Sequence, residues 1–290
     1  MQLLADLPSL ELKARYMIDG FLAGRHRSPQ KGSSVEFAEY RAYQPGDDLR
    51  RVDWRLYART DRLHLKQYEE ETQLHVYLVL DTSQSMNFQS RPELVSKIAF
   101  ARLALAAIGL TAQRQGDAFG LALVGAGLQD YLRARSSMPH WRSFVGRIES
   151  VKPGGTTSLA KCLEDLAELI PPRSMVVIAS DFYEDSPLLE AAVRRLRYDH
   201  HDLIGLHVLD PVEIDFDLDQ TGHFLDVEDG RRLRVDVAAV RKGYLDKFSA
   251  FCGDLDELFH RAGGDVTRLR TDASPITAIS GYLARRSQSL

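Results

Sequence analysis

The sequence predicts an α/β fold in which a mostly parallel β-sheet is covered by helices on both faces. Short apolar runs rich in β-branched residues alternate along the chain with segments of helical period, as in proteins built from successive β-α-β units. The apolar runs are nearly unbroken, which is typical of strands buried on both faces. With 290 residues, the chain is long enough for one large α/β domain or two modest ones.

The first part of the chain follows a different pattern from the rest. Residues 9–22 predict an amphipathic helix, and residues 25–34, which are basic and rich in Ser, Gly and Pro, predict a loop. The block at residues 36–60 interleaves acids, arginines and aromatics in an order that fits neither the helical nor the strand period. Residues 63–71 alternate enough to predict a strand.

Beyond this part, strands and helices alternate in the order expected for a parallel sheet. The predicted strands occupy residues 76–81, 119–125, 130–134, 175–181, 203–209 and 265–269. The predicted helices occupy residues 93–114, 139–149, 159–170, 186–197, 237–262 and 274–285. An Asp-Gly turn at residues 229–230 predicts a β-hairpin insertion near residues 222–236.

Composition and charge are those of an ordinary globular protein. The chain is 44% hydrophobic and 27% charged, with a formal net charge of -4. Acidic and basic residues are interleaved, so the charge pattern predicts no contact with nucleic acid or anionic lipid. No apolar run approaches the roughly 20 residues that span a bilayer, and the N-terminus lacks the pattern of a signal peptide. We therefore expect a cytoplasmic protein whose cysteines, Cys162 and Cys252, are reduced packing residues.

Oxygen-bearing side chains follow several of the predicted strands. Asp81 ends the first buried strand, with Ser83 and Ser85 at alternate positions after it, while Thr156 follows two glycines and Asp181 ends another strand. An Asp-x-Ser-x-Ser run by itself is more often turn and N-cap chemistry. Because open α/β sheets bind ligands at the carboxyl ends of their strands, we expect the three loops to form one site. Hydroxyls and carboxylates without His or Cys suit Mg²⁺, Mn²⁺ or Ca²⁺ rather than zinc.

In this order and setting, Asp81, Ser83, Ser85, Thr156 and Asp181 resemble the metal-ion-dependent adhesion site of the von Willebrand factor A-type (integrin I-like) fold. The resemblance implies a von Willebrand A-like, Rossmann-like sheet. It also implies an ion held by these residues directly or through water. An acidic side chain from a partner would complete the coordination of that ion.

The upstream block contains a second set of motifs. They are Glu36-Phe, Tyr40-Arg41-Ala-Tyr43-Gln-Pro45-Gly46-Asp47-Asp48, Arg50-Arg51-Val-Asp53-Trp54, Ala58-Arg59 and Leu65-Lys66. These motifs resemble the signature of the prokaryotic domain-of-unknown-function family numbered fifty-eight, and the resemblance covers residues 9 to about 210. It implies an adaptor or chaperone-like role beside a MoxR-type AAA+ ATPase, with a client protein that presents an acidic residue.

We therefore interpret residues 1–72 as a family-signature segment packed on a von Willebrand A-like domain of residues 73–290. Charged and aromatic residues of that segment are candidates for partner docking, namely Arg41, Tyr43, Asp47, Asp48, Arg50, Asp53, Trp54 and Arg59. Trp, Tyr and Arg dominate the energetics of interfaces, which favours docking. The density of opposite charges favours a structural network instead, and we take the structural interpretation as the main one.

Two other functions use the same residues. A metal-dependent phosphoester hydrolase needs a general base or second metal beside Asp81 and Asp181, for which Glu184 and Asp185 are candidates. Acids at such positions more often serve a helix N-terminus. An RNA-binding module would use the arginines and aromatics of the upstream block, but the interleaved acids disfavour it. Because the sequence contains no nucleotide-binding loop, we expect a metal-dependent interaction protein, with any ATP hydrolysis supplied by its partner.

Overall fold

The computed structural model describes residues 9–24, 37–43, 52, 54–68, 74–155, 158–184, 186–218, 222–225, 232–274, 276 and 280. The chain divides into two compact units, one of Met1–Gly24 with Leu74–Leu290 and one of Arg25–Gln73. The first helix, α2 (Leu10–Gly24), therefore belongs to the larger unit. The smaller unit corresponds to the remainder of the predicted family-signature segment.

The larger unit is built on a six-stranded sheet in the order β10-β7-β6-β3-β4-β5. Its strands are β3 (His75–Asp81), β4 (Ala118–Val124), β5 (Leu128–Arg135), β6 (Met175–Ser180), β7 (Asp202–Leu209) and β10 (Asp265–Arg270). All neighbouring pairs are parallel except β4 and β5, which are antiparallel. The predicted unbroken apolar strands are buried along nearly their whole length.

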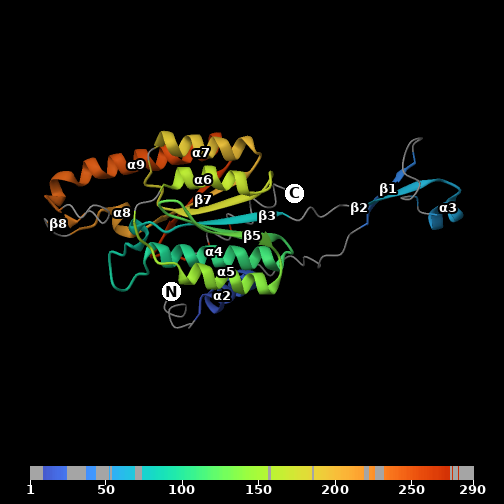
Figure 1. The fold of residues 1–290 in the computed structure, drawn as a ribbon, viewed down its shortest axis with the longest axis horizontal. Helices are drawn as coiled ribbons and strands as arrows, with labels where there is room; N and C mark the ends of the chain where they lie inside the picture. Colours follow the sequence, from blue (N-terminus) through green and yellow to red (C-terminus); the bar gives the residue numbers. More distant parts are fainter. Residues whose placement is uncertain are drawn as a thin grey trace. The chain divides into compact units, whose positions relative to one another are not determined.

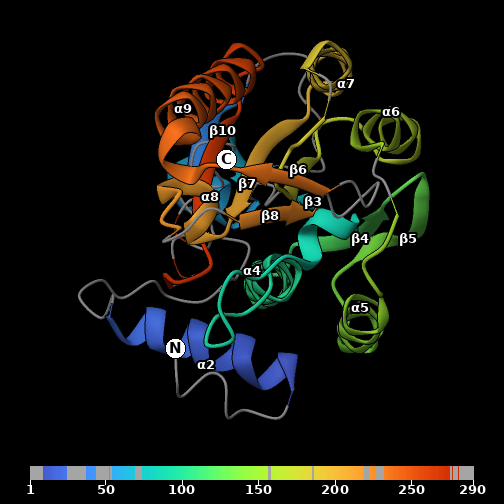
Figure 2. The same cartoon turned by 90° about the vertical axis from the view of Figure 1, so that its left-hand side faces the viewer.

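Helices cover both faces of this sheet (Figures 1 and 2). One layer consists of α2, α4 (Lys97–Arg114) and α5 (Met138–Ser150), and the other of α6 (Leu159–Leu169), α7 (Ser186–Tyr198) and α9 (Val237–Arg261). Each layer has its own hydrophobic core: Leu78 and Leu80 of β3 pack into the first, Tyr77 and Val79 into the second, because strand side chains alternate between faces. The prediction of an α/β, von Willebrand A-like sheet is confirmed. None of the helices in the described ranges combines the length and apolarity needed to cross a bilayer.

Two elements near the carboxyl edge of the sheet differ from the sequence-based expectation. Helix α4 begins at Lys97 rather than at residue 93, because Ser96 is extended (ψ 155°) and the backbone N–H of Lys97 bonds to the carbonyl of Phe88. A short helix, α8 (Pro211–Asp215), was not predicted. Its start is a capping box in which Asp210 and Glu213 bond each other's backbone N–H groups. The run Asp-Pro-x-Glu is the signal that could have revealed it.

The predicted hairpin is present as β8 (Gly222–Leu225) paired antiparallel with β9 (Arg232–Val235). Its turn at residues 226–231 lies outside the described residues, as does most of the predicted helix at residues 274–285. The smaller unit contains β1 (Phe37–Ala42), α3 (Trp54–Thr60) and β2 (His64–Tyr68), with β1 and β2 antiparallel. The block that fitted neither period thus contains one strand and one short helix.

Candidate functional site

Two strand ends carry the predicted carboxylates to the same edge of the sheet. Strands β3 and β6 are parallel neighbours with Leu80 opposite Ala179, so Asp81 and the Ser180–Asp181 pair emerge side by side. All three of these side chains are buried, with at most 1% of their surface exposed. Tertiary structure therefore brings together residues that lie a hundred positions apart in the sequence.

Asp81 is oriented by two hydrogen bonds, one on each oxygen. Its Oδ1 accepts the backbone N–H of Ser83 at 2.9 Å, and its Oδ2 accepts the Ser180 hydroxyl at 2.6 Å. The Ser180 oxygen in turn accepts the N–H of Phe182 at 2.8 Å. The hydroxyls of Ser83 and Ser85 lie 3.0 Å apart. The loop after β3 thus presents one carboxylate and two hydroxyl oxygens in a fixed arrangement.

Thr156 lies outside the described residues, but the glycines before it touch the same loop. The backbone N–H of Gln84 donates to the carbonyl of Gly155 at 3.0 Å, and the N–H of Gly154 donates to the carbonyl of Thr82 at 2.9 Å. These bonds fasten the Gly-Gly loop to the Asp81 loop. The three predicted loops therefore meet at one edge of the sheet. This is the expected result, because two of them follow parallel strands and the third precedes a helix.

The electrostatics of this edge are unfavourable for two free carboxylates. Burial, followed by the nearby Asp181 carboxylate, raises the pKa of Asp81 to about 6, although hydrogen bonds from Ser180 and Ser83 oppose the rise. A carboxyl group with a raised pKa is one whose negative charge is under-compensated. A bound cation would remove that deficit.

A buried lysine, absent from the predicted set, lies against Asp181. The Lys97 Nζ is 2.7 Å from Asp181 Oδ2 and 2.7 Å from Glu213 Oε1, and the lysine side chain is 1% exposed. The other Glu213 oxygen accepts the backbone N–H of Asp210 at 2.7 Å. The Tyr183 ring lies 5.4 Å from the ammonium, within cation–π range. The ammonium thus joins the end of β6 to the start of α8.

Lys97 is charged in this environment. Burial alone would lower the pKa of its ammonium, but Asp181 and Glu213 together outweigh burial and the pKa lies above its ordinary value. Sequence reasoning missed this residue because its partners are distant in the chain. The available signal was a lysine at the head of a helix whose next residues, 98–112, are almost all buried.

The donor set fits a hard divalent cation. The candidate ligands are Asp81, Ser83, Ser85 and Asp181, all of which offer oxygen. The Lys97 ammonium pairs with the carboxylates of Asp181 and Glu213, and the Asp81 carboxylate lies near Asp181, so these three carboxylates exceed the one ammonium by two negative charges. Within the described part of the chain, no three His, Cys, Asp or Glu side chains converge as a metal-binding group, so an ion here needs the hydroxyls as well.

Glu184, a candidate general base for hydrolysis, has a structural partner. Its Oε2 accepts the backbone N–H of Ala160 in the first turn of α6 at 3.3 Å. Acidic side chains stabilise helix N-termini through such bonds. Asp185, the other candidate, lies outside the described residues.

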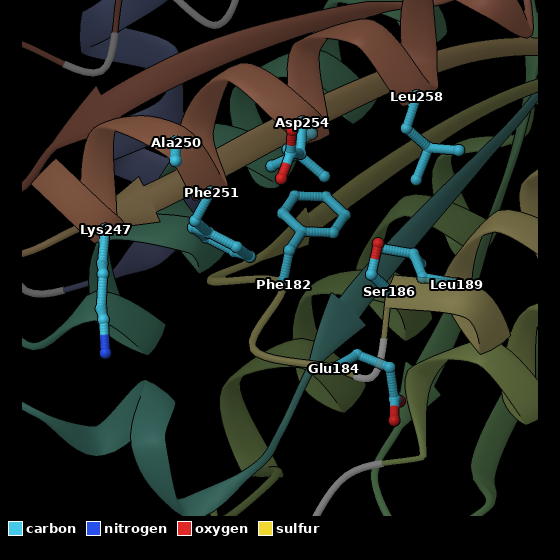
Figure 3. Close-up of a pocket in the computed structure, with 10 residues that line it drawn as sticks. Phe182, Glu184, Ser186, Leu189, Lys247, Ala250, Phe251, Asp254 and Leu258 are labelled. Atoms are coloured by element: carbon cyan, nitrogen blue, oxygen red, sulfur yellow. The ribbon is translucent and has the colours of Figure 1, made fainter.

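A cavity of about 250 Å³ opens beside the site, between the chain that follows β6 and helix α9. Figure 3 shows Phe182 and Leu189 facing Phe251 and Leu258 across it. Its volume is below the roughly 300–1,000 Å³ of typical small-molecule sites. Beneath it lies fully buried His207, in edge contact with Phe182 and Phe251 at 5.9 and 5.7 Å between ring centroids. Burial lowers the pKa of His207 to about 4, so this imidazole is neutral.

The proposed docking residues are only partly described. Asp47, Asp48, Arg50 and Asp53 lie outside the described residues, and Arg41 is described only as backbone of β1. The backbone N–H of Tyr43 bonds to the Leu63 carbonyl at 3.0 Å. Trp54 is 57% exposed and lies edge-on to Tyr57 at 6.2 Å, and Arg59 is exposed as well.

The chain is similar to one protein family, to curated relatives and to several solved structures. The family described as "Protein of unknown function DUF58" matches residues 39–250. An uncharacterized protein of Mycobacterium tuberculosis is 30% identical over 296 residues, which covers 98% of this chain and 90% of that protein. The crystal structure of BatB, a conserved hypothetical protein from Bacteroides thetaiotaomicron, matches 74% of this chain and 99% of its own, with 15% identity and a TM-score of 0.50. The VWA domain of SpRpn10 matches 72% of this chain and 94% of its own, with 9% identity and a TM-score of 0.40.

Proposed function

Since the chain belongs to the DUF58 family of proteins of unknown function, we propose that it is a metal-dependent protein-interaction protein. In this proposal Asp81, Ser83, Ser85, Thr156 and Asp181 hold a Mg²⁺ ion, or Mn²⁺ or Ca²⁺ in its place. An acidic side chain of a client protein completes the coordination. A MoxR-type AAA+ ATPase is the partner that would supply ATP hydrolysis.

The observation that carries the proposal is the buried pair of carboxylates at adjacent strand ends. Asp81 and Asp181 are almost completely buried, and the cluster around them has two negative charges more than positive ones. Buried charge of this kind is costly unless it is paired or bound to a metal. Hydroxyl and carboxylate oxygens are the donors that Mg²⁺ and Ca²⁺ prefer.

The chain's own residues would prepare this site before a partner arrives. Ser180 and the backbone of Ser83 hold the Asp81 carboxylate in one orientation, and Lys97 does the same for Asp181. A bound divalent ion supplies a positive charge to which a carboxylate of the partner can bind. The support for a MoxR-type partner is the resemblance of the upstream motifs to a family associated with such ATPases.

The first experiment is a thermal-shift titration of the full chain with Mg²⁺, Mn²⁺ and Ca²⁺. A ligand that binds only the native state raises its stability by mass action, by about 2.7 kcal/mol at a hundredfold excess over Kd. We expect this response in the wild type and its loss in Asp81→Ala. Asp19→Ala, which removes an exposed carboxylate, is the matched control. Equal, flat responses of the folded wild type and Asp81→Ala over millimolar metal would refute the metal site.

A second experiment tests the partner. The full chain is mixed with a purified MoxR-type ATPase, and the complex is isolated in Mg²⁺ or in chelator. We expect a complex that depends on Mg²⁺ and is lost in Asp81→Ala. A complex that forms equally in chelator would show that the ATPase binds without the metal site.

A further inference from the structure

Lys97 places a permanent positive charge inside the candidate metal site. Its ammonium is held by Asp181 and Glu213 at 2.7 Å each and is almost fully withdrawn from water. The lysine carries no donor that a cation could use, because an ammonium has three donors and no acceptor. The Lys97 ammonium therefore repels any metal ion that Asp181 binds.

Glu213 and the backbone of Lys97 are themselves fixed in place. Glu213 accepts the backbone N–H of Asp210 on its second oxygen, and its carbonyl accepts the Tyr244 hydroxyl of α9 at 2.7 Å. The backbone N–H of Lys97 donates to the carbonyl of Phe88 at 3.1 Å. The ammonium thus stays against Asp181 as long as α8 and α9 keep their places.

We propose that Lys97 is a specificity-determining residue of the metal site. It lowers the affinity of the chain alone for a divalent ion, so that the ion binds tightly only when an external carboxylate also coordinates it. This inference rests on the proposed function. With Lys97, the three carboxylates, the ammonium and a divalent ion sum to zero charge. Without Lys97 the filled site carries one net negative charge, which repels an acidic side chain. Charges a few ångströms apart in a protein interior interact strongly, so one unit of charge is enough to decide whether the filled site attracts or repels an external carboxylate.

Mn²⁺ is a suitable probe, because free Mn²⁺ is counted directly by its electron paramagnetic resonance signal. Lys97→Met keeps an unbranched side chain that is one atom shorter and removes the charge, and we expect it to bind Mn²⁺ about tenfold or more tightly than the wild type. Glu213→Gln removes one negative charge and should bind Mn²⁺ more weakly than the wild type. Arg114→Met removes a positive charge from the far end of the same helix and should leave Mn²⁺ binding unchanged.

A double variant keeps the test valid if Lys97→Met alone fails to fold. Lys97→Met with Glu213→Gln retains the wild-type net charge of the cluster and leaves no unpaired carboxylate beside α8. We expect it to bind Mn²⁺ more tightly than the wild type, because the charge nearest Asp181 is the one removed. Circular dichroism of each variant establishes that it is folded.

A second measurement uses acetate as the external carboxylate, with chloride at equal ionic strength as its control. Acetate should raise the Mn²⁺ affinity of the wild type and should fail to do so in Lys97→Met. Mn²⁺ binding that is equal or weaker in folded Lys97→Met and in the double variant overturns the role of Lys97 and leaves the proposed function standing.

The converse outcome separates the two proposals. If Lys97→Met binds Mn²⁺ and the wild type binds it neither alone nor with acetate, the ammonium takes the place of the ion; the proposed function then falls while the charge effect of Lys97 stands. If no folded variant binds Mn²⁺, both are overturned.

Discussion

Replacing Asp81 by asparagine should stabilise the metal-free protein, although it removes a residue at the centre of the candidate site. Burial and the Asp181 carboxylate raise the pKa of Asp81 from 3.8 to about 6. Between these two values the native state holds a proton that the unfolded state releases. The contribution of Asp81 to the free energy of unfolding of the wild type therefore falls as the pH rises from about 4 through 6.

The size of the effect follows from the shift. Each pKa unit corresponds to about 1.4 kcal/mol, so the ionised Asp81 destabilises the metal-free protein by about 3 kcal/mol above pH 6. Asparagine carries no charge and avoids this loss. Its amide has one acceptor oxygen in place of two, so it cannot accept both the Ser83 N–H and the Ser180 hydroxyl, and we allow about 1 kcal/mol for the lost hydrogen bond. The variant should therefore be more stable by about 2 kcal/mol at pH 8.

Urea unfolding in the presence of a chelator measures this difference, at pH 4 and at pH 8. At pH 4 the advantage of Asp81→Asn should vanish or reverse, because the wild-type carboxyl is then protonated in the native state and carries no buried charge. On adding Mg²⁺ at pH 8, the wild type should gain stability and the variant should not. A wild type that is the more stable protein at pH 8 in chelator, or a difference that does not change with pH, would refute the reasoning.

Three further predictions concern residues around the site. Burial lowers the pKa of His207 from 6.5 to about 4, so the contribution of His207 to metal-free stability should fall by about 3 kcal/mol as the pH drops through this interval. His207→Leu should flatten that fall in urea unfolding, while exposed His260→Gln should not. Gly120→Ala places a Cβ 2.6 Å from the Leu132 carbonyl oxygen and 2.7 Å from the Tyr77 ring. It should lower the unfolding free energy by about 1–3 kcal/mol, whereas Gly146→Ala, which meets nothing within 4 Å, should not lower it. Glu184→Gln should cost about 1 kcal/mol at the α6 N-terminus and keep the Mg²⁺ response in a thermal-shift assay. Loss of that response would contradict its assignment as a helix cap.

Local pattern was enough to predict most of the larger unit. Its strands are buried on both faces, so their sequences are continuous apolar runs that end abruptly at polar residues. Because parallel strands have their carboxyl ends at one edge, the place of Asp81 and Asp181 followed from the order of elements alone. The hairpin was also predicted from local sequence, because an Asp-Gly turn is a strong short-range signal.

Periodicity failed where elements are short. Strand β1 has 6 residues and helix α3 has 7, which is less than the window in which a helical or strand period can be recognised. Helix α4 begins later than its pattern suggests, because the chain before Lys97 is held by tertiary contacts. The N–H of Ser90, for example, bonds to the Asp210 carboxylate at 3.0 Å.

The sequence by itself determined the sheet, its buried strands and the oxygen donors at their ends. Tertiary structure alone decided the charge of the site. Lys97 meets Asp181 and Glu213 across 84 and 116 positions of the chain, and no local pattern encodes such a pairing. Its ammonium is charged there because two carboxylates from different elements surround it, and the raised pKa of Asp81 has the same origin in burial and in a neighbour on another strand. The residue types in the sequence thus determine which side chains can coordinate an ion, while the net charge of the site depends on how the whole domain folds.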